Sequence, residues 1–232
     1  MPPASLEAQL RELTARGWRG ATLTEAIQRP PYQRTLVVTF DDGFLSVLDN
    51  AEPILTKLGI PGTLFVPTAF MDTRQPLLWA GLDQWSDTAF AQELIGLEWA
   101  DLTGLVARGW EIGSHTCTHP LLTQLEPDAA HRELLDSRLA CEQHLGVPCN
   151  SVAYPYGHVN QQVADAAQEA GYEVGVSLAN DLAPAGPLRS PRIGIYHDDN
   201  PWRFMLKTNV AIRRLRATRM WPARASTPHL GQ

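Results

Sequence analysis

The chain has 232 residues, of which 44% are hydrophobic and 19% are charged. This length and composition favour a single domain with a substantial core, and they exclude a collagen-like or low-complexity chain. No stretch of about 18 residues is uninterruptedly apolar, so we expect no transmembrane segment. Residues 1–13 lack the basic and apolar regions of a signal peptide, and the literal expectation is a cytoplasmic protein.

The formal net charge of −6 conceals an uneven distribution. Residues 1–202 carry 12 basic and 25 acidic residues, a net charge of −13, which argues against nucleic acid as a partner. The end of the chain is either a solvated basic helix and tail or a contact with an anionic membrane or glycan. It holds seven basic residues and no acidic one: Arg203, Lys207, Arg213, Arg214, Arg216, Arg219 and Arg224.

The three cysteines, Cys117, Cys141 and Cys149, form no Cys-x-x-Cys pair. We therefore expect neither a zinc–thiolate site nor a disulfide scaffold, and a reducing compartment is the simpler default. Whether Cys141 and Cys149 form a disulfide stays open.

Taken in chain order, the hydrophobic pattern predicts strands that alternate with helices. The continuous apolar run 35–40 is typical of a strand that is buried on both faces. Such an alternation indicates a parallel sheet in one α/β domain, either doubly wound or closed into a barrel. The predicted helices are 5–17, 45–58, 102–108, 129–145, 160–170 and 201–216, and the predicted strands are 35–40, 63–67, 110–114, 151–154, 172–177 and a sixth at 192–196.

Three polar clusters directly follow predicted strands, where barrel enzymes place their catalytic residues. Each cluster also has a structural interpretation. Two adjacent aspartates can cap the helix that follows, a His-x3-His pair is common by chance, and Tyr-Pro-Tyr-Gly can simply form a rigid turn. The clusters are Asp41-Asp42-Gly43, His115-Thr-Cys-Thr-His119-Pro120 and Tyr154-Pro-Tyr156-Gly157.

Together the clusters favour a metal-dependent hydrolase. His115 and His119, four residues apart, would share one face of a helical turn, with Cys117 pointing elsewhere. One aspartate and two histidines supply three ligands and leave coordination positions open, which is the catalytic pattern. A metal makes water a stronger acid, and the second aspartate can accept its proton. This chemistry suits hydrolysis of an amide or ester.

At these residues the sequence resembles the polysaccharide deacetylase family, also called the NodB-homology or carbohydrate esterase family 4 domain. The resemblance spans roughly residues 35–197 and is carried by Thr39-Phe-Asp-Asp-Gly43, by the His115–Pro120 cluster and by Tyr154-Pro-Tyr-Gly157. It implies a distorted (β/α) barrel of about six to seven parallel strands. It also implies a divalent metal, most often zinc, and removal of acetyl groups from a saccharide.

The resemblance further implies individual roles. Asp41 would be the general base, and Asp42, His115 and His119 would be the metal ligands. The backbone N–H of Tyr156 would donate to the tetrahedral oxyanion.

The chain departs from the family pattern at two points. Ala153 stands where many members have an arginine that braces the catalytic aspartate, and Arg192 is our candidate to replace it. The usual general-acid histidine is also absent. In a circularly permuted subset it lies on an N-terminal Met-x-Tyr-His strand. Residues 5–23 resemble the stretch after that strand, but no histidine precedes His115. We expect His197, or else His158, as the substitute.

We accordingly expect a helical lead-in over 1–33, the deacetylase-like barrel over 34–216 and a basic, flexible tail over 217–232. The predicted activity is N-deacetylation of a neutral N-acetylated saccharide, with Trp79 and Trp85 as candidates to stack on sugar rings. The alternatives are a hydrolase of a non-sugar amide and a weakly active or inactive glycan-binding relative. If the start is shortened, the cell envelope or exterior becomes the expected location.

Overall fold

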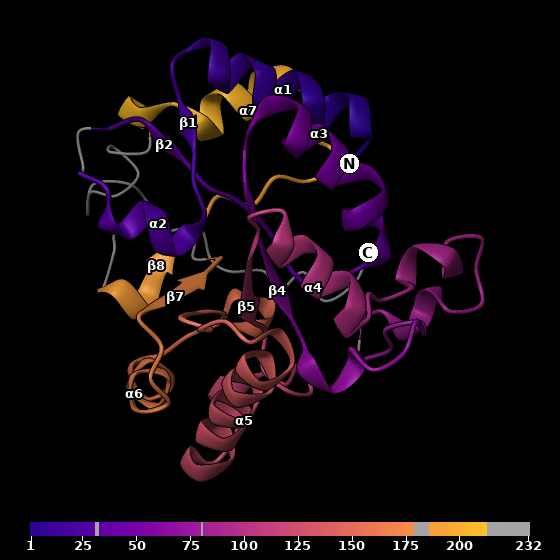
Figure 1. Ribbon diagram of the computed structural model, residues 1–232, viewed down its shortest axis with the longest axis vertical. Helices are drawn as coiled ribbons and strands as arrows, with labels where there is room; N and C mark the ends of the chain where they lie inside the picture. The colour runs from indigo at the N-terminus through magenta and orange to yellow at the C-terminus, as the bar shows by residue number, and fades with distance from the viewer. Residues whose placement is uncertain (31–32, 80, 179–185, 213–232) are drawn as a thin grey trace.

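The computed structural model describes residues 1–30, 33–79, 81–178 and 186–212 of the chain. Its centre is a six-stranded parallel sheet in the order β3-β4-β5-β6-β7-β8, which curls into part of a barrel (Figure 1). The distorted α/β barrel expected from the sequence is thereby confirmed. The strands are β3 (Val38–Phe40), β4 (Gly62–Val66), β5 (Glu111–Ser114), β6 (Ser151–Ala153), β7 (Val174–Ser177) and β8 (Ser190–Pro191).

Helices connect these strands and cover the sheet (Figure 1). A short parallel pair, β1 (Arg19–Gly20) and β2 (Thr35–Leu36), precedes the main sheet. Among the described helices, none is both long and apolar enough to cross a bilayer. The helices are α1 (Pro3–Ala15), α2 (Leu23–Gln28), α3 (Glu52–Leu58), α4 (Trp99–Ala107), α5 (Pro127–Leu145), α6 (Gln161–Glu169) and α7 (Pro201–Thr208).

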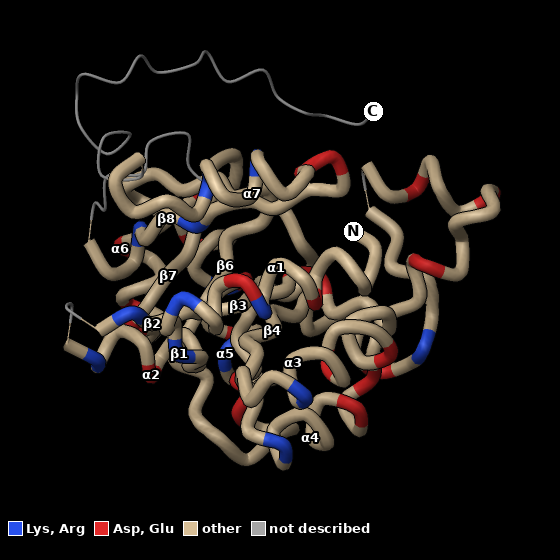
Figure 2. The backbone as a smooth tube through the Cα atoms, turned by 90° about the horizontal axis from the view of Figure 1, so that it is seen from above, with Lys and Arg blue, Asp and Glu red and all other residues tan. Residues whose placement is uncertain are grey.

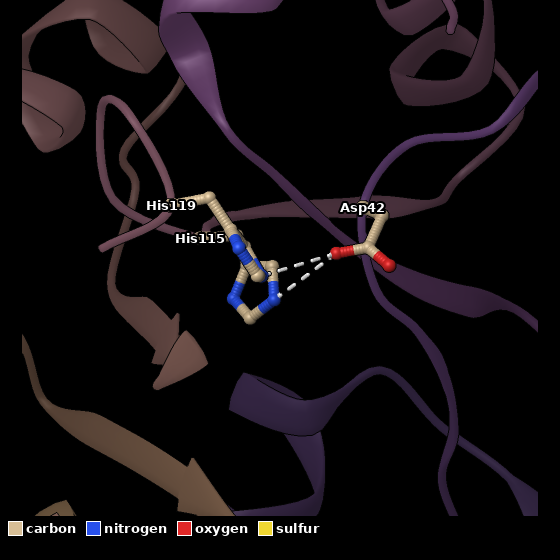
Figure 3. Close-up of side chains that lie close together, drawn as sticks. All are labelled: Asp42, His115 and His119. Atoms are coloured by element: carbon tan, nitrogen blue, oxygen red, sulfur yellow. Dashed lines mark ion pairs between the residues drawn. The ribbon is translucent and has the colours of Figure 1, made fainter. Parts of the chain in front are cut away.

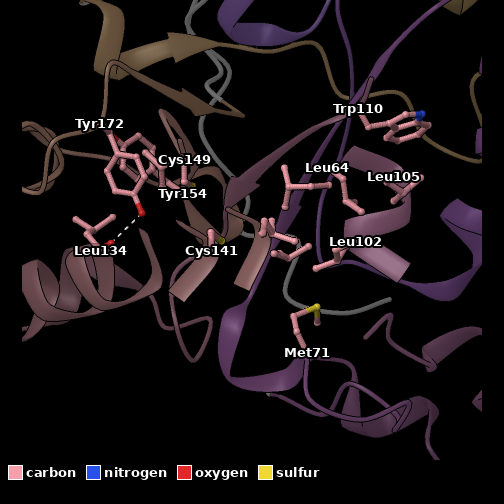
Figure 4. Close-up of a cluster of buried hydrophobic side chains, with 14 of the residues drawn as sticks. Leu64, Met71, Leu102, Leu105, Trp110, Leu134, Cys141, Cys149, Tyr154 and Tyr172 are labelled. Atoms are coloured by element: carbon pink, nitrogen blue, oxygen red, sulfur yellow. Dashed lines mark hydrogen bonds between the residues drawn. The ribbon is translucent and has the colours of Figure 1, made fainter. Parts of the chain in front are cut away.

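The core lies between the sheet and the helices α3, α4 and α5 (Figure 4). Trp110 packs so closely over β4 that a Cβ atom at Gly62 would lie 2.3 Å from its ring, so only glycine fits there. A buried polar contact ties α5 to the sheet layer, since the Tyr172 hydroxyl donates to the Leu134 carbonyl over 2.8 Å. Cys141 and Cys149 lie in this core with free thiols.

The curled sheet does not close among the described strands, because β3 and β8 are its two outer strands and do not pair. A cavity of about 960 Å³ runs between them. Leucines of α1, the strand β3, the segment 190–196 and Phe204 of α7 line it. Figure 1 shows α1 and α7 on this side of the sheet, so helices rather than a strand cover the gap.

Two predicted strands differ from the structure. The run 35–40 is interrupted at Val37 into β2 and β3, and its residues are half-buried rather than buried on both faces, because β3 is an outer strand. The segment 192–196 is not a strand. The last strand is the two-residue β8 just before it, and Pro191 in β8 cannot donate a ladder hydrogen bond.

The structure contains a helix at each predicted position, but the first and last residues of the helices differ from those predicted. Helix 45–58 contains a widened π turn over Val47–Ala51, because Pro53 lacks an N–H and its ring crowds the carbonyl four residues earlier. The helix predicted over 201–216 ends at Thr208 and resumes at Val210. Its last residues and the expected tail over 217–232 lie outside the described residues.

Candidate metal centre and active site

The three polar clusters meet at one end of the sheet because the strands are parallel and in register. Phe40 pairs with Leu64, and Ser114 pairs with both Val66 and Val152. The residues that follow β3, β5 and β6 therefore emerge at the same edge, the carboxyl end of the strands. This is the placement that the sequence predicts.

Asp42, His115 and His119 converge there on one point (Figure 3). One potential ligand atom from each lies within 4.8 Å of the others, and no further histidine, cysteine or carboxylate joins the group among the described residues. The Nε2 atoms of both histidines lie 3.4 Å from Asp42 Oδ1. This oxygen is buried without a hydrogen-bond partner among the described residues. A buried, unsatisfied carboxylate oxygen facing two imidazole nitrogens fits a divalent cation.

The backbone at this site is held in an unusual conformation. All four non-glycine residues with positive φ in the described chain lie in the three clusters: Asp42, Thr116, His119 and Tyr156. Such angles are uncommon for residues with a Cβ and persist where the surrounding structure imposes them. The loop 115–119 is consequently not helical, so the predicted helical turn is wrong, although both histidines still reach the same point.

Hydrogen bonding orients His115 as a ligand. Its Nδ1 lies 2.7 Å from the Ala153 carbonyl, which can only accept, so Nδ1 carries the proton and Nε2 is left free. Burial alone would lower the pKa of His115, but the contact with Asp42 and the charge of Asp41 outweigh it and raise the pKa. The backbone carbonyl of Ala153 is thus part of the site.

His119 lies against Trp79, whose ring stacks on the imidazole at 4.3 Å between centroids. Burial, together with the charge of His115, lowers the pKa of His119 to about 4. The ring is therefore neutral at physiological pH, as a metal ligand must be. Trp79 is a predicted sugar-stacking residue, and the structure shows one face of its ring packed on a candidate ligand. Trp85 packs edge-to-face with Phe90.

Asp41 forms a two-pronged ion pair with Arg192, with both oxygen–nitrogen distances at 2.7 Å. The same guanidinium donates to Thr39 Oγ1 over 3.0 Å. Burial would raise the pKa of Asp41, but the charge and hydrogen bonds of Arg192 prevail and lower it to about 2. The Asp41 side chain, still 25% exposed, is thus ionised and accessible beside the three candidate ligands.

The third cluster places Tyr156 at the rim of the site. Its exposed ring lies edge-on to His119, with centroids 4.8 Å apart. Its backbone N–H donates to no acceptor among the described residues. An unpaired N–H in a strained turn is the kind of donor that an oxyanion requires.

Two candidate general acids do not join this site. His197 lies in an exposed turn and His158 is exposed beyond the third cluster. No hydrogen bond, ion pair or ring contact joins either to the candidate ligands within the described ranges. Cys117 also stays apart, as predicted, and burial raises its pKa to about 11, which keeps it a thiol.

The sequence did not predict the residues that support the loop 115–119. Glu133 of α5 accepts hydrogen bonds from the backbone N–H groups of Cys117 and Thr118, each over 2.9 Å, and from the Thr118 hydroxyl. Ser114 Oγ accepts from the Thr116 N–H. A glutamate on a helix normally indicates a solvated residue, so no sequence signal marked Glu133.

The profile of the family described as "Polysaccharide deacetylase" matches residues 28–175, which include all three clusters. The chain belongs to the polysaccharide deacetylase family. Among its curated relatives, YxkH of Bacillus subtilis (strain 168), named after the polysaccharide deacetylases, is 24% identical over 182 residues, or 76% of this chain. A chitooligosaccharide deacetylase of Bradyrhizobium sp. (strain ANU 289) is 31% identical over 147 residues, or 60% of this chain. The chain spans 58% and 53% of these two relatives, respectively.

Solved structures of deacetylases share the fold. The Streptococcus pyogenes deacetylase PplD, in complex with acetate, superposes with a TM-score of 0.72 at 23% identity. The superposition covers 89% of this chain and 87% of the PplD chain. IcaB from Ammonifex degensii gives a TM-score of 0.69 at 22% identity, with 94% and 90% covered. At this identity the likeness establishes the fold of the polysaccharide deacetylases for nearly the whole chain.

Proposed function

We propose that this polysaccharide deacetylase family member hydrolyses the acetamido group of an N-acetylated saccharide. The observation that carries the proposal is the placement of an ionised Asp41 beside the Asp42–His115–His119 group. A curated relative named as a chitooligosaccharide deacetylase supports the substrate class.

The three candidate ligands fit a divalent cation, most plainly zinc, because two imidazoles and one carboxylate leave coordination positions open. When such a cation is bound, it supplies Lewis-acid chemistry and makes water a stronger acid. His115 is held in the ligand tautomer by the Ala153 carbonyl, and Trp79 covers one face of His119.

The remaining groups act on the proton and on the oxyanion. Asp41 accepts the proton of the water that adds to the acetyl carbon, and Arg192 holds this carboxylate in place and ionised. The Tyr156 N–H donates to the oxygen that becomes negative, an interaction worth about 3 kcal/mol of barrier for one such donor. The C–N bond then breaks as the proton held by Asp41 passes to the leaving nitrogen, so that the amine and acetate are released and Asp41 is ionised again.

The test compares Asp41→Asn with the wild-type protein, both loaded with zinc, on N-acetylglucosamine oligomers. We expect acetate release to fall at least about 100-fold while zinc content is unchanged, because asparagine cannot accept the proton. Asp49→Asn, an exposed position on the following helix, is the matched control and should keep the wild-type rate.

Equal rates for Asp41→Asn and the wild type would remove Asp41 from the mechanism. A wild-type protein that binds zinc but releases no acetate from any glycan would overturn the proposal and favour the glycan-binding alternative.

A further inference from the structure

Helix α7 presents an apolar stripe to solvent. Phe204 points into the molecule and is buried, whereas Trp202, Met205 and Leu206 are exposed. Their spacing of three and four residues places the exposed side chains on one face. The Trp202 side chain is 65% exposed, which is far more than tryptophan side chains usually are in folded proteins.

The turn that precedes α7 also carries an exposed aromatic side chain. Tyr196 is 60% exposed, and the Lys207 amine lies 4.9 Å from the centre of its ring. Lys207 also bonds to the Gly194 carbonyl and pairs with Asp199, which ties the turn to the helix. We call the exposed residues Tyr196, Trp202, Met205, Leu206 and Val210 the α7 patch.

The sequence that continues from the α7 patch is basic, whereas the described charged residues beside the patch balance one another. Arg203 and Lys207 lie on α7 itself, where Figure 2 marks Lys and Arg in blue. Lys207 and Asp199 neutralise each other, and the exposed Asp198 offsets Arg203, so the attraction to anionic lipid would come from the basic sequence that follows. From residue 203 to 232 the sequence contains seven basic residues and no acidic one, against an acidic remainder. Basic residues beside exposed tryptophan, tyrosine and leucine are the composition of helices that lie in the interface of a membrane.

We propose that the α7 patch docks on an anionic lipid bilayer. A symmetric second copy fits less well, because it would place this basic end against itself. Nucleic acid would contact the basic residues but would leave Met205 and Leu206 in water. The cavity lined by Phe204 of α7 also contains Asp41 and Arg192, so docking would bring the catalytic end of the sheet close to the lipid surface.

The test is co-sedimentation of the full chain with vesicles of phosphatidylcholine alone and with about 30% phosphatidylglycerol. We expect binding to the anionic vesicles only, and a marked loss of binding between about 0.05 and about 0.5 M NaCl, because salt screens the attraction. Trp202→Glu should weaken binding about tenfold or more by removing the largest apolar side chain of the patch and adding a negative charge. Leu139→Glu makes the same charge change at a 48% exposed position of α5 and should bind like the wild type.

Met205→Glu provides a second variant should Trp202→Glu fail to fold, with circular dichroism as the check. Absence of vesicle binding, equal binding to both vesicle types, or equal weakening by Trp202→Glu and Leu139→Glu would each overturn the proposal. A wild-type dimer that Trp202→Glu converts to a monomer, without vesicle binding, would assign the patch to a second copy. Acetate release from soluble oligomers should be the same for Trp202→Glu and the wild type, so this test is independent of the proposed function.

Discussion

At the scale of single residues, the pair Asp41–Arg192 shows what the sequence can and cannot specify. Two adjacent aspartates after a strand predict a polar site, because buried carboxylates need a partner. The partner lies 151 residues away, and Arg192 could be chosen only by its position at the start of a predicted strand. The structure brings the two together although that strand, 192–196, does not exist as predicted.

Arg192→Gln should destabilise the protein in a pH-dependent way. The pKa of Asp41 is lowered from 3.8 to about 2, so the pair stabilises the fold above pH 3.8 and loses this contribution as the pH falls to about 2. We expect a loss of about 2 kcal/mol in the free energy of unfolding at neutral pH, which shrinks over that window. Urea unfolding at several pH values measures it.

Arg11→Gln, in an exposed ion pair on α1, serves as the control and should change stability by well under 1 kcal/mol. A difference between Arg192→Gln and the wild type that stays constant from pH 7 to about pH 2 would contradict the assigned role of the pair.

The left-handed residues at the site could not be predicted from the sequence. Four residues adopt a positive φ, a backbone conformation that residues other than glycine rarely take: Asp42, Thr116, His119 and Tyr156. Local propensity argues against it at each position, and only tertiary contacts impose it. For this reason the sequence predicted candidate ligands that converge in the structure, but it predicted the wrong backbone between His115 and His119.

At the scale of elements, helix α5 holds the loop 115–119, which carries two candidate metal ligands, in place. Glu133 satisfies two backbone N–H groups between the two histidines, and Ser114 at the end of β5 satisfies a third. The sequence predicted α5 and β5 as separate elements but not this contact, because a helix pattern does not reveal which polar residue faces which loop. A loop without regular structure thereby gains a fixed conformation.

Glu133→Ala should weaken zinc binding about tenfold or more, since a loosened loop no longer presents His115 and His119 together. Glu133→Gln, which can still accept hydrogen bonds, should recover part of the affinity. Competition with a chromophoric chelator measures the dissociation constants, and Glu126→Gln at the exposed start of α5 is the control. A lower melting temperature of the metal-free protein with unchanged zinc affinity would show that Glu133 is structural only.

At the scale of the whole molecule, the parallel sheet explains the site. Strands alternating with helices sufficed to predict an α/β barrel with its polar clusters at one end, because parallel strands share a direction. The sequence did not reveal the open gap between β3 and β8, nor that α1 and α7 cover it, since pairing at a sheet edge depends on contacts between distant segments. The exposed apolar surface of α7 belongs to this same side of the molecule.

The central claim is that Asp42, His115 and His119 hold the metal on which hydrolysis depends. The most direct measurement is acetate release from N-acetylglucosamine oligomers by one sample in three states. The sample is assayed when loaded with zinc, again after chelation and dialysis, and a third time after zinc is added back. Its metal content is determined at each step. We predict that the zinc-loaded protein releases acetate, that chelation abolishes this release, and that added zinc restores it. The His119→Ala variant should not regain acetate release when zinc is added. Release that persists in a sample shown to be free of metal would contradict this claim.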